Sequence, residues 1–227
     1  MHAEFAEGLD TSTCEVVEIA GVVADTGAKF ATVVCPTTLG QSEDAAAVHG
    51  ITVEELQSAP PFPIAFERFC AFLSASADDA LEEVIDTSEG ESQDMTPPDV
   101  PLPALCSPAP VVVLAAHNGM KFDGPVLVHQ CIRYGLPICH LGRFKWLDTL
   151  EVAKAYGTSP CVKLQCLVRD AAADLGSAHR ALDDAVALHA VMLRMAERRS
   201  VPLARLLKPF VVDFDVTTSL VDIAAGL

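Results

Sequence analysis

The sequence has no long apolar run. Its 227 residues are 51% hydrophobic, with a mean hydropathy of +0.34, yet no window of about 18 uninterrupted apolar residues occurs. The opening residues, MHAEFAEGLD, are acidic. They have neither the basic-plus-apolar layout of a signal peptide nor the Arg-rich character of a transit peptide. These absences predict a protein without a transmembrane helix, located in the cytoplasm or nucleus.

Closely spaced cysteine pairs are also missing. The chain has eight cysteines but no C-x-x-C, and most of them lie inside apolar runs, for example Cys70, Cys131 and Cys166. The pair Cys139-His140 has no partner pair at zinc-ligand spacing. We therefore expect reduced cysteines packed in the core, and neither a disulfide framework nor a zinc site.

Basic charge is scarce. Fifteen Lys and Arg residues face 31 Asp and Glu residues, so the formal net charge is −16. Such a surface repels phosphate backbones, which excludes binding of long nucleic acid by bulk electrostatics. An enzyme that binds only a few nucleotides through metal ions is compatible with this net charge.

The first half of the chain contains a hairpin, two helices and an insert. Apolar runs at 16–23 and 30–35 flank a turn at 25–29, which predicts the hairpin. Thr52, followed three residues later by Glu55, forms the pattern of a capping box, and a second helix is expected at 64–75. Residues 76–109 are acidic and serine-rich, then proline-rich, which predicts a mobile insert in a single domain spanning residues 1–227.

The second half alternates strands and helices, which indicates an α/β fold. A buried strand is expected at 111–116 and a short strand that runs into a helix at 144–156. Further helices are expected at 125–135, 163–176 and 179–199.

Two groups of polar residues stand out. The run AHNGMKFDGPVL follows the strand 111–116 and places Asp123 at the start of the next helix; active sites of α/β folds collect at such strand ends. The run HRALDDA places His179 and Asp184 on the first turns of a helix. Each has a plainer reading: Asp123 as an acid favoured by the helix dipole, His179 as a helix cap, and Asp184 as a solvated acid.

The motifs HNGMKFD, WLDTL, KLQCL and HRALDDA, in this order, resemble the DEDDh 3′→5′ exonucleases, the superfamily of proofreading exonucleases, RNase T and oligoribonuclease. The early hairpin and the HGIT helix start also match, so the resemblance covers roughly residues 15–75 and 110–199. It implies an RNase H-like mixed sheet flanked by helices. In that family four carboxylates hold two divalent metals and a histidine is the general base. Carried over, Asp123 and Asp184 become metal ligands for two Mg²⁺ or Mn²⁺ ions, and His179 becomes the base.

The front of the chain departs from this pattern. The family begins with a central strand bearing Asp-x-Glu, just before the strand that corresponds to EIAGVV. Here the preceding residues offer Glu4 and Glu7 but no apolar run that could form such a strand.

The stretch KPFVVDFDVTTSL, residues 208–220, resembles the missing strand. Asp213 and Asp215 are two residues apart and so point to the same face of a strand. We therefore predict a circular permutant in which 208–218 is the central strand, between 16–23 and 111–116, and in which Asp213 and Asp215 complete the metal site. Asp215 stands where the family usually has Glu and is one methylene shorter.

Three alternatives stay open. The segment 208–220 can be a fortuitous β-like tail on a catalytically inactive exonuclease fold that serves as an interaction or scaffold module. It can be exchanged between two chains of a homodimer. The central strand can also come from a partner protein.

The resemblance implies hydrolysis of 3′-terminal phosphodiesters, with release of nucleoside monophosphates, from single-stranded or short nucleic acid. Asn118, Gly119, His49 and Ile51 are the expected substrate-binding residues. The candidate phosphate contacts are Lys121, Arg133, Lys145 and Arg180.

Overall fold

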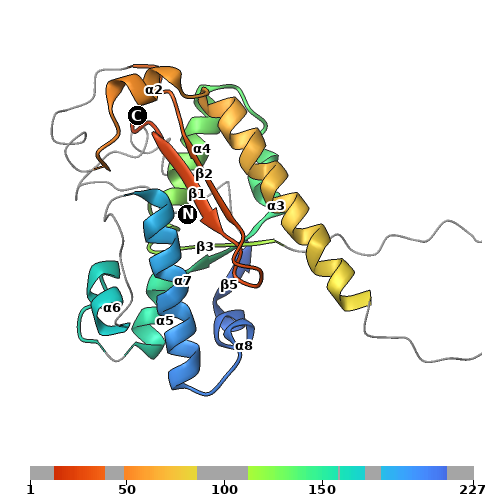
Figure 1. Cartoon of the computed structure of the whole chain (residues 1–227), viewed down its shortest axis with the longest axis vertical. Helices are drawn as coiled ribbons and strands as arrows, with labels where there is room; N and C mark the ends of the chain where they lie inside the picture. The colour runs from red at the N-terminus through yellow and green to blue at the C-terminus, as the bar shows by residue number, and fades with distance from the viewer. Residues whose placement is uncertain (1–12, 39–48, 86–111, 158, 172–179, 214–227) are drawn as a thin grey trace, which may run out of the picture.

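The computed structural model describes residues 13–38, 49–85, 112–157, 159–171 and 180–213 (Figure 1). These residues form a mixed α/β structure with helices around two short sheets, which confirms the α/β fold class. No helix in these ranges is both long and apolar enough to cross a membrane.

The first sheet is the predicted hairpin. Strand β1 (Glu18–Val22) pairs antiparallel with β2 (Lys29–Val33), in a register that places Glu18 opposite Val33. The chain reverses at Gly27, whose φ of 71° is a conformation that glycine adopts without strain. The amide of Gly27 donates a 2.9 Å hydrogen bond to the carbonyl of Val23 and closes the turn.

The second sheet has the order β3-β4-β5. Strand β3 (Val113–Ala116) lies parallel to β4 (Lys145–Asp148), and β5 (Val211–Asp213) pairs antiparallel with the other edge of β4. Trp146 and Leu147, adjacent on β4, are each 1% exposed and belong to different hydrophobic cores. Because successive strand residues point to opposite faces, the sheet separates two apolar layers.

The helices cover the two sides of this sheet. Phe62, Phe66 and Phe69 of α3 pack with α4 in the first core, whereas the second core is built by α5, α6 and α7. In Figure 1, α5, α6 and α7 lie at the lower left and α3 at the right. The helices are α2 (Val53–Ser58), α3 (Phe62–Ile85), α4 (Asp123–Arg133), α5 (Thr149–Tyr156), α6 (Leu164–Ala171), α7 (Ala181–Arg198) and α8 (Leu203–Leu207), with 3₁₀ turns η1 (Ile138–Arg143) and η2 (Lys208–Phe210).

Two expectations about the first half have different outcomes. The capping box is confirmed: the Thr52 hydroxyl accepts from the Glu55 amide, and the Glu55 carboxylate accepts from the Thr52 amide. Helix α3 continues through Ile85, so the first ten residues of the segment 76–109 are helical. The rest of the predicted insert lies outside the described residues.

The predicted place of the C-terminal strand is wrong. Residues 211–213 lie at the outer edge of β4 and not between β1 and β3. Between α7 and β5 the chain forms α8, whose Leu206 is buried in the second core, and Phe210 and Val211 are partly buried against this core. Burial of these apolar side chains directs the chain to β4. Residues 214–218 lie outside the described residues, and no described strand joins β1 to β3.

One cysteine expectation also needs correction. Cys161 and Cys166 form a disulfide, because the turn before α6 brings their Cα atoms to 5.9 Å. Cys14, Cys35, Cys70 and Cys131 are reduced, as predicted. Burial raises the pKa of the Cys131 thiol to about 12, which makes it unreactive at neutral pH.

Candidate active site

The turn that follows β3 is anchored by the neighbouring strand. Because β3 and β4 are parallel, their carboxyl ends meet at one edge of the sheet. Asp148, the last residue of β4, accepts hydrogen bonds from the amides of Asn118 (2.8 Å) and Leu150 (2.9 Å) through the same carboxylate oxygen. One side chain therefore caps α5 and holds Asn118, whose φ of 61° lies in the left-handed region.

His117 ties the same turn to the segment before α6. Its Nδ1 lies 3.1 Å from the Thr149 hydroxyl and its Nε2 lies 2.9 Å from the carbonyl of Val162. Burial lowers the pKa of His117, and the Val162 carbonyl and Asp148 only partly oppose this effect. The imidazole is therefore neutral at physiological pH and acts as a structural link. Neither His117 nor Asp148 is predicted as a site residue from the sequence, although Asp148 before Thr149 in WLDTL has the pattern of a helix N-cap.

Gly119 packs closely against Ala116, beside the first candidate acid. A Cβ atom at this position would lie 2.5 Å from the Cβ of Ala116 and 3.4 Å from Oδ2 of Asp123. Asp123 is the first residue of α4 and is 2% exposed. The HNGMKFD motif thus forms a tight turn that places a buried carboxylate at a helix N-terminus, where the helix dipole favours negative charge.

The second candidate acid is Asp184, in the first turn of α7, where it is 4% exposed. The start of α7 is bound to β1. Glu18 accepts hydrogen bonds from the Arg180 guanidinium and from the amide of Ala181. The general base predicted at His179 lies outside the described residues.

The HGIT segment lies near the same helix start. Glu55 contributes to raising the pKa of Arg180, after the larger contribution of the Glu18 hydrogen bond. His49 accepts a 3.0 Å hydrogen bond from the amide of Ile51 through Nδ1. Ile51, predicted as a substrate-binding residue, is 2% exposed, so its side chain is buried in the protein.

Asp213 lies at the other end of the sheet. It pairs with Lys145, the first residue of β4, whereas Asp148 and the turn after β3 lie at the opposite end of these strands. Its side chain is 85% exposed and forms an ion pair with Lys145. The structure therefore does not bring Asp213 to the edge that carries Asp123, and Asp215 lies outside the described residues. Within the described ranges, no group of three or more His, Cys, Asp or Glu side chains could hold a metal ion.

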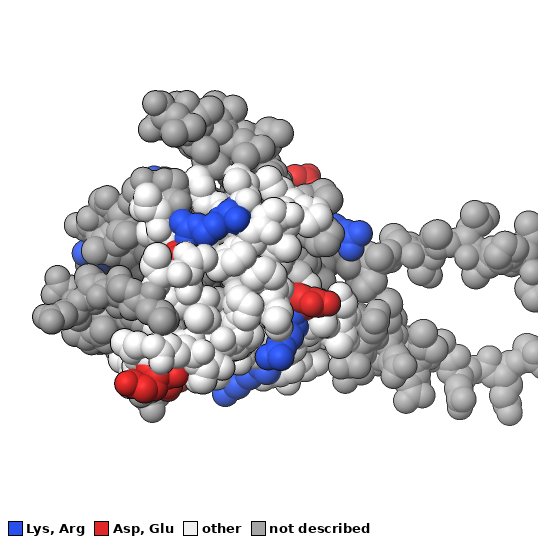
Figure 2. Space-filling model, turned by 90° about the horizontal axis from the view of Figure 1, so that it is seen from above, with Lys and Arg blue, Asp and Glu red and all other residues white. Residues whose placement is uncertain are grey.

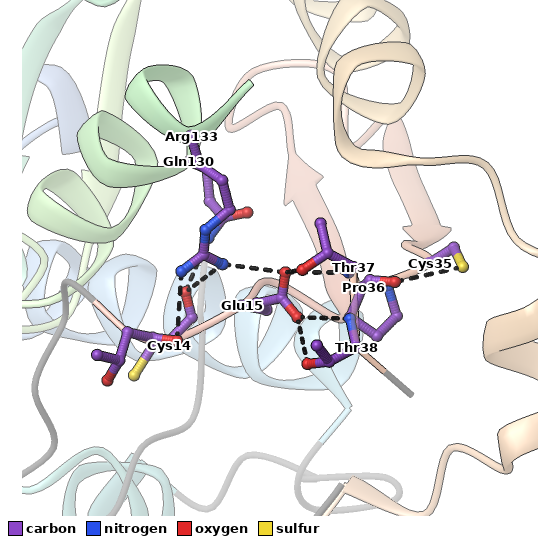
Figure 3. A network of polar contacts seen from close by, with 9 residues as sticks. Cys14, Glu15, Cys35, Pro36, Thr37, Thr38, Gln130 and Arg133 are labelled. Carbon is purple, nitrogen blue, oxygen red and sulfur yellow. Dashed lines mark hydrogen bonds and ion pairs between the residues drawn. The ribbon is translucent and has the colours of Figure 1, made fainter. Parts of the chain in front are cut away.

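Three of the four predicted phosphate contacts have structural partners. Lys145 pairs with Asp213, Arg180 with Glu18, and Arg133 with Glu15 at 3.0 Å. In Figure 3, Arg133 also points at the backbone carbonyls that precede β1. The Glu15 carboxylate accepts hydrogen bonds from the amides of Thr37 and Thr38. On the face shown in Figure 2, lysine and arginine atoms lie in separate small groups among mostly uncharged atoms.

Several solved structures are similar to this protein in fold. The nuclease domain of 3'hExo, a DEDDh family member solved with rAMP bound, superposes with a TM-score of 0.57 and 17% identity over 80% of this chain and 80% of that chain. The fold is that of the DEDDh 3′ exonucleases. A full-length 3'-exonuclease matches with a TM-score of 0.55 and 15% identity over 88% of this chain and 80% of that one.

A third structure with the exonuclease fold is cell-death related nuclease 4 (CRN-4). It matches with a TM-score of 0.53 and 14% identity over 82% of this chain and 57% of that chain. No protein-family model and no curated protein matches the sequence. At these low identities the similarity shows the exonuclease fold.

Proposed function

We propose that this protein is a metal-dependent 3′→5′ exonuclease that acts on single-stranded or short nucleic acid. The observation that carries the proposal is the burial of Asp123 and Asp184, each in the first turn of a helix, within an exonuclease fold. Among the similar structures, one holds rAMP and another concerns recognition of the 3′ end of a histone mRNA stem-loop by a 3'-exonuclease. These descriptions apply to those proteins and support the substrate class proposed here.

Asp123 and Asp184 supply the ligand type that Mg²⁺ and Mn²⁺ prefer. Both ions bind hard oxygen donors, and Mg²⁺ is commonly held by one or two carboxylates together with water and substrate phosphates. Two carboxylates fit that coordination, with Asp215 as a further proposed ligand. The proposed pair of ions would supply stabilisation of the charge that develops on the phosphate and on the attacking and leaving oxygens.

The residues of the chain would share the remaining tasks. In the proposed reaction water attacks the 3′-terminal phosphorus, the bond from phosphorus to the neighbouring 3′ oxygen breaks, and a nucleoside monophosphate leaves. His179 would accept the proton of the attacking water. Asn118 and Gly119, held beside Asp123 by Asp148, would line the pocket of the terminal nucleotide together with His49.

A second function is favoured by one specific observation. Asp213, predicted as a ligand, is paired with Lys145 at the opposite end of the sheet. This placement supports the alternative that the fold is a catalytically inactive interaction module. Stoichiometric metal binding distinguishes the two functions, because an interaction module needs no divalent ion.

The test combines Mn²⁺ titration calorimetry with degradation of a 5′-labelled oligonucleotide. Wild-type protein is expected to bind Mn²⁺ and to shorten the oligonucleotide stepwise from its 3′ end. Asp123→Asn and Asp184→Asn are expected to lose both properties. Asp170→Asn, which changes an exposed α6 acid paired with Arg198, is the matched control and should retain them. Absence of Mn²⁺ binding by the wild type would refute the catalytic function.

A further inference from the structure

Helix α7 has no N-cap side chain of its own. Its N-cap residue, Arg180, has an extended backbone and makes no side-chain capping bond. An α-helix begins with four amides that lack partners within the helix. One of these, the amide of Ala181, donates a 2.8 Å hydrogen bond to Oε2 of Glu18, which lies 163 residues earlier in the chain. A carboxylate on a strand therefore caps a helix that is far away in the sequence and close only in the folded protein.

The same carboxylate also binds the cap residue. The Arg180 guanidinium donates through Nη2 to Oε1 of Glu18 at 2.8 Å and through Nε to both carboxylate oxygens at 3.2 Å. The Glu18 side chain is 7% exposed and that of Arg180 is 36% exposed. Hydrogen bonds between ionised groups in such a partly buried environment are among the stronger ones in proteins. This interaction raises the pKa of Arg180, so its guanidinium stays charged at all physiological pH values.

These contacts restrict the position of Asp184. The amide of Asp184 donates to the carbonyl of Arg180 at 3.1 Å, so the residue that Glu18 holds also accepts the hydrogen bond that begins the first helical turn. Ala181, Asp184, Ala185 and Leu188 follow the spacing of one helix face, and all four are buried. A shift or rotation of this turn would move the Asp184 carboxylate with it.

We infer that Glu18 is a positioning residue for Asp184, acting through the Ala181 amide and the Arg180 guanidinium, and not a ligand or a catalytic group itself. This inference rests on the metal-binding role proposed for Asp184. It also assigns Arg180 to the protein scaffold, because its guanidinium donates to the Glu18 carboxylate.

Its test uses full-length wild type, Glu18→Gln and Arg180→Gln, with Arg198→Gln as the matched control. Arg198 lies at the other end of α7 and pairs with Asp170, so its variant removes an ion pair of the same helix far from Asp184. Hydrogen exchange of the 181–185 amides reports anchoring of the first turn, Mn²⁺ titration reports the position of Asp184, and urea unfolding reports global stability.

Glu18→Gln is expected to speed exchange of the 181–185 amides by about tenfold or more, since it removes charge-assisted bonds. It should also weaken Mn²⁺ binding by about 10- to 100-fold, as loss of an orienting partner of a metal ligand does. Arg180→Gln keeps the bond between Glu18 and the Ala181 amide, so its effects on both readouts should be smaller. Arg198→Gln should change neither.

Faster exchange in Glu18→Gln with unchanged Mn²⁺ affinity would overturn the inference, because Glu18 would then only stabilise the helix. Equal acceleration along the whole of α7 would also overturn it. If Glu18→Gln does not fold, Arg180→Gln supplies the same comparison at reduced amplitude. Lack of Mn²⁺ binding by the wild type would instead refute the proposed nuclease function, and the anchoring of α7 would still be decided by exchange alone.

Discussion

Lys145 and Asp213 face each other across the antiparallel ladder between β4 and β5, and their side chains form an ion pair. Lys145 begins β4, and Asp148, which anchors the turn leading to Asp123, ends it. The two positions are three steps apart along the strand, which is about 10 Å. Asp213, predicted as a metal ligand, is thus a surface partner of a lysine.

Substitution of Asp213 is expected to leave the proposed metal site intact. Asp213→Asn removes an exposed ion pair, so the free energy of unfolding should change by less than about 1 kcal/mol, with Mn²⁺ affinity unchanged. Asp184→Asn is the comparison and should abolish Mn²⁺ binding. Calorimetric titration of both variants checks this, and a loss of Mn²⁺ binding in Asp213→Asn would show that β5 reaches the metal site.

A methyl group at Gly119 should disturb Asp123. Gly119→Ala forces a contact of 2.5 Å with the Cβ of Ala116, so the turn that leads to Asp123 must move. The expected cost is about 1–3 kcal/mol of unfolding free energy, together with weaker Mn²⁺ binding. Gly157→Ala meets the Ala153 carbonyl at 2.4 Å and is the control, because Gly157 follows α5, away from the HNGMKFD turn. It should lower stability without changing metal affinity. An equal loss of Mn²⁺ affinity in the two variants would show that the loss does not arise from displacement of the turn before Asp123.

Glu15 should make stability depend on acid pH. Burial raises the pKa of its carboxyl, but hydrogen bonds from the side chains and amides of Thr37 and Thr38 outweigh burial and hold the pKa below the ordinary glutamate value. A carboxyl with a lowered folded pKa stabilises the protein above its unfolded pKa, and this stability is lost as the pH falls through the folded value.

The measurement is the urea midpoint between about pH 7 and pH 3. Glu15→Gln should be less stable than wild type at neutral pH and should lose less stability on acidification. Glu67→Gln, which changes an exposed carboxylate on α3, is the control and should follow the wild-type curve. Parallel curves for wild type and Glu15→Gln would contradict the contribution assigned to Glu15.

Reduction of the Cys161–Cys166 disulfide should lower stability modestly. The bridge closes a loop of about six residues, for which chain entropy predicts about 2 kcal/mol. The loop includes Val162, whose carbonyl contacts His117, so reduction should also loosen the turn after β3. Thermal unfolding with and without a reductant checks this. The Cys161→Ser, Cys166→Ser double variant should not respond to the reductant, and a response of the same size would assign the effect to another disulfide.

Much of the fold follows from local sequence. The hairpin of β1 and β2, the capping box at Thr52, the strand-to-helix transition at Asp148 and the helix bearing Asp184 all depend on neighbouring residues whose periodicity or capping chemistry is visible in the chain. The turn carrying Asn118 and Gly119 before Asp123 is also predictable from the sequence, because it follows an apolar strand. These features are encoded within a few residues of each other.

Long-range packing determines the position of β5 and the partners of several charged side chains, which the local sequence pattern does not predict. The β-like run 211–213 is compatible with any strand edge, and burial of Leu206, Phe210 and Val211 against the second core directed it to β4. The pairing of Glu18 with Arg180 joins residues 162 positions apart, and Glu15 meets Thr37 only after the hairpin forms. Such partners are chosen by the free energy of the whole packed chain, so no short stretch of sequence contains them.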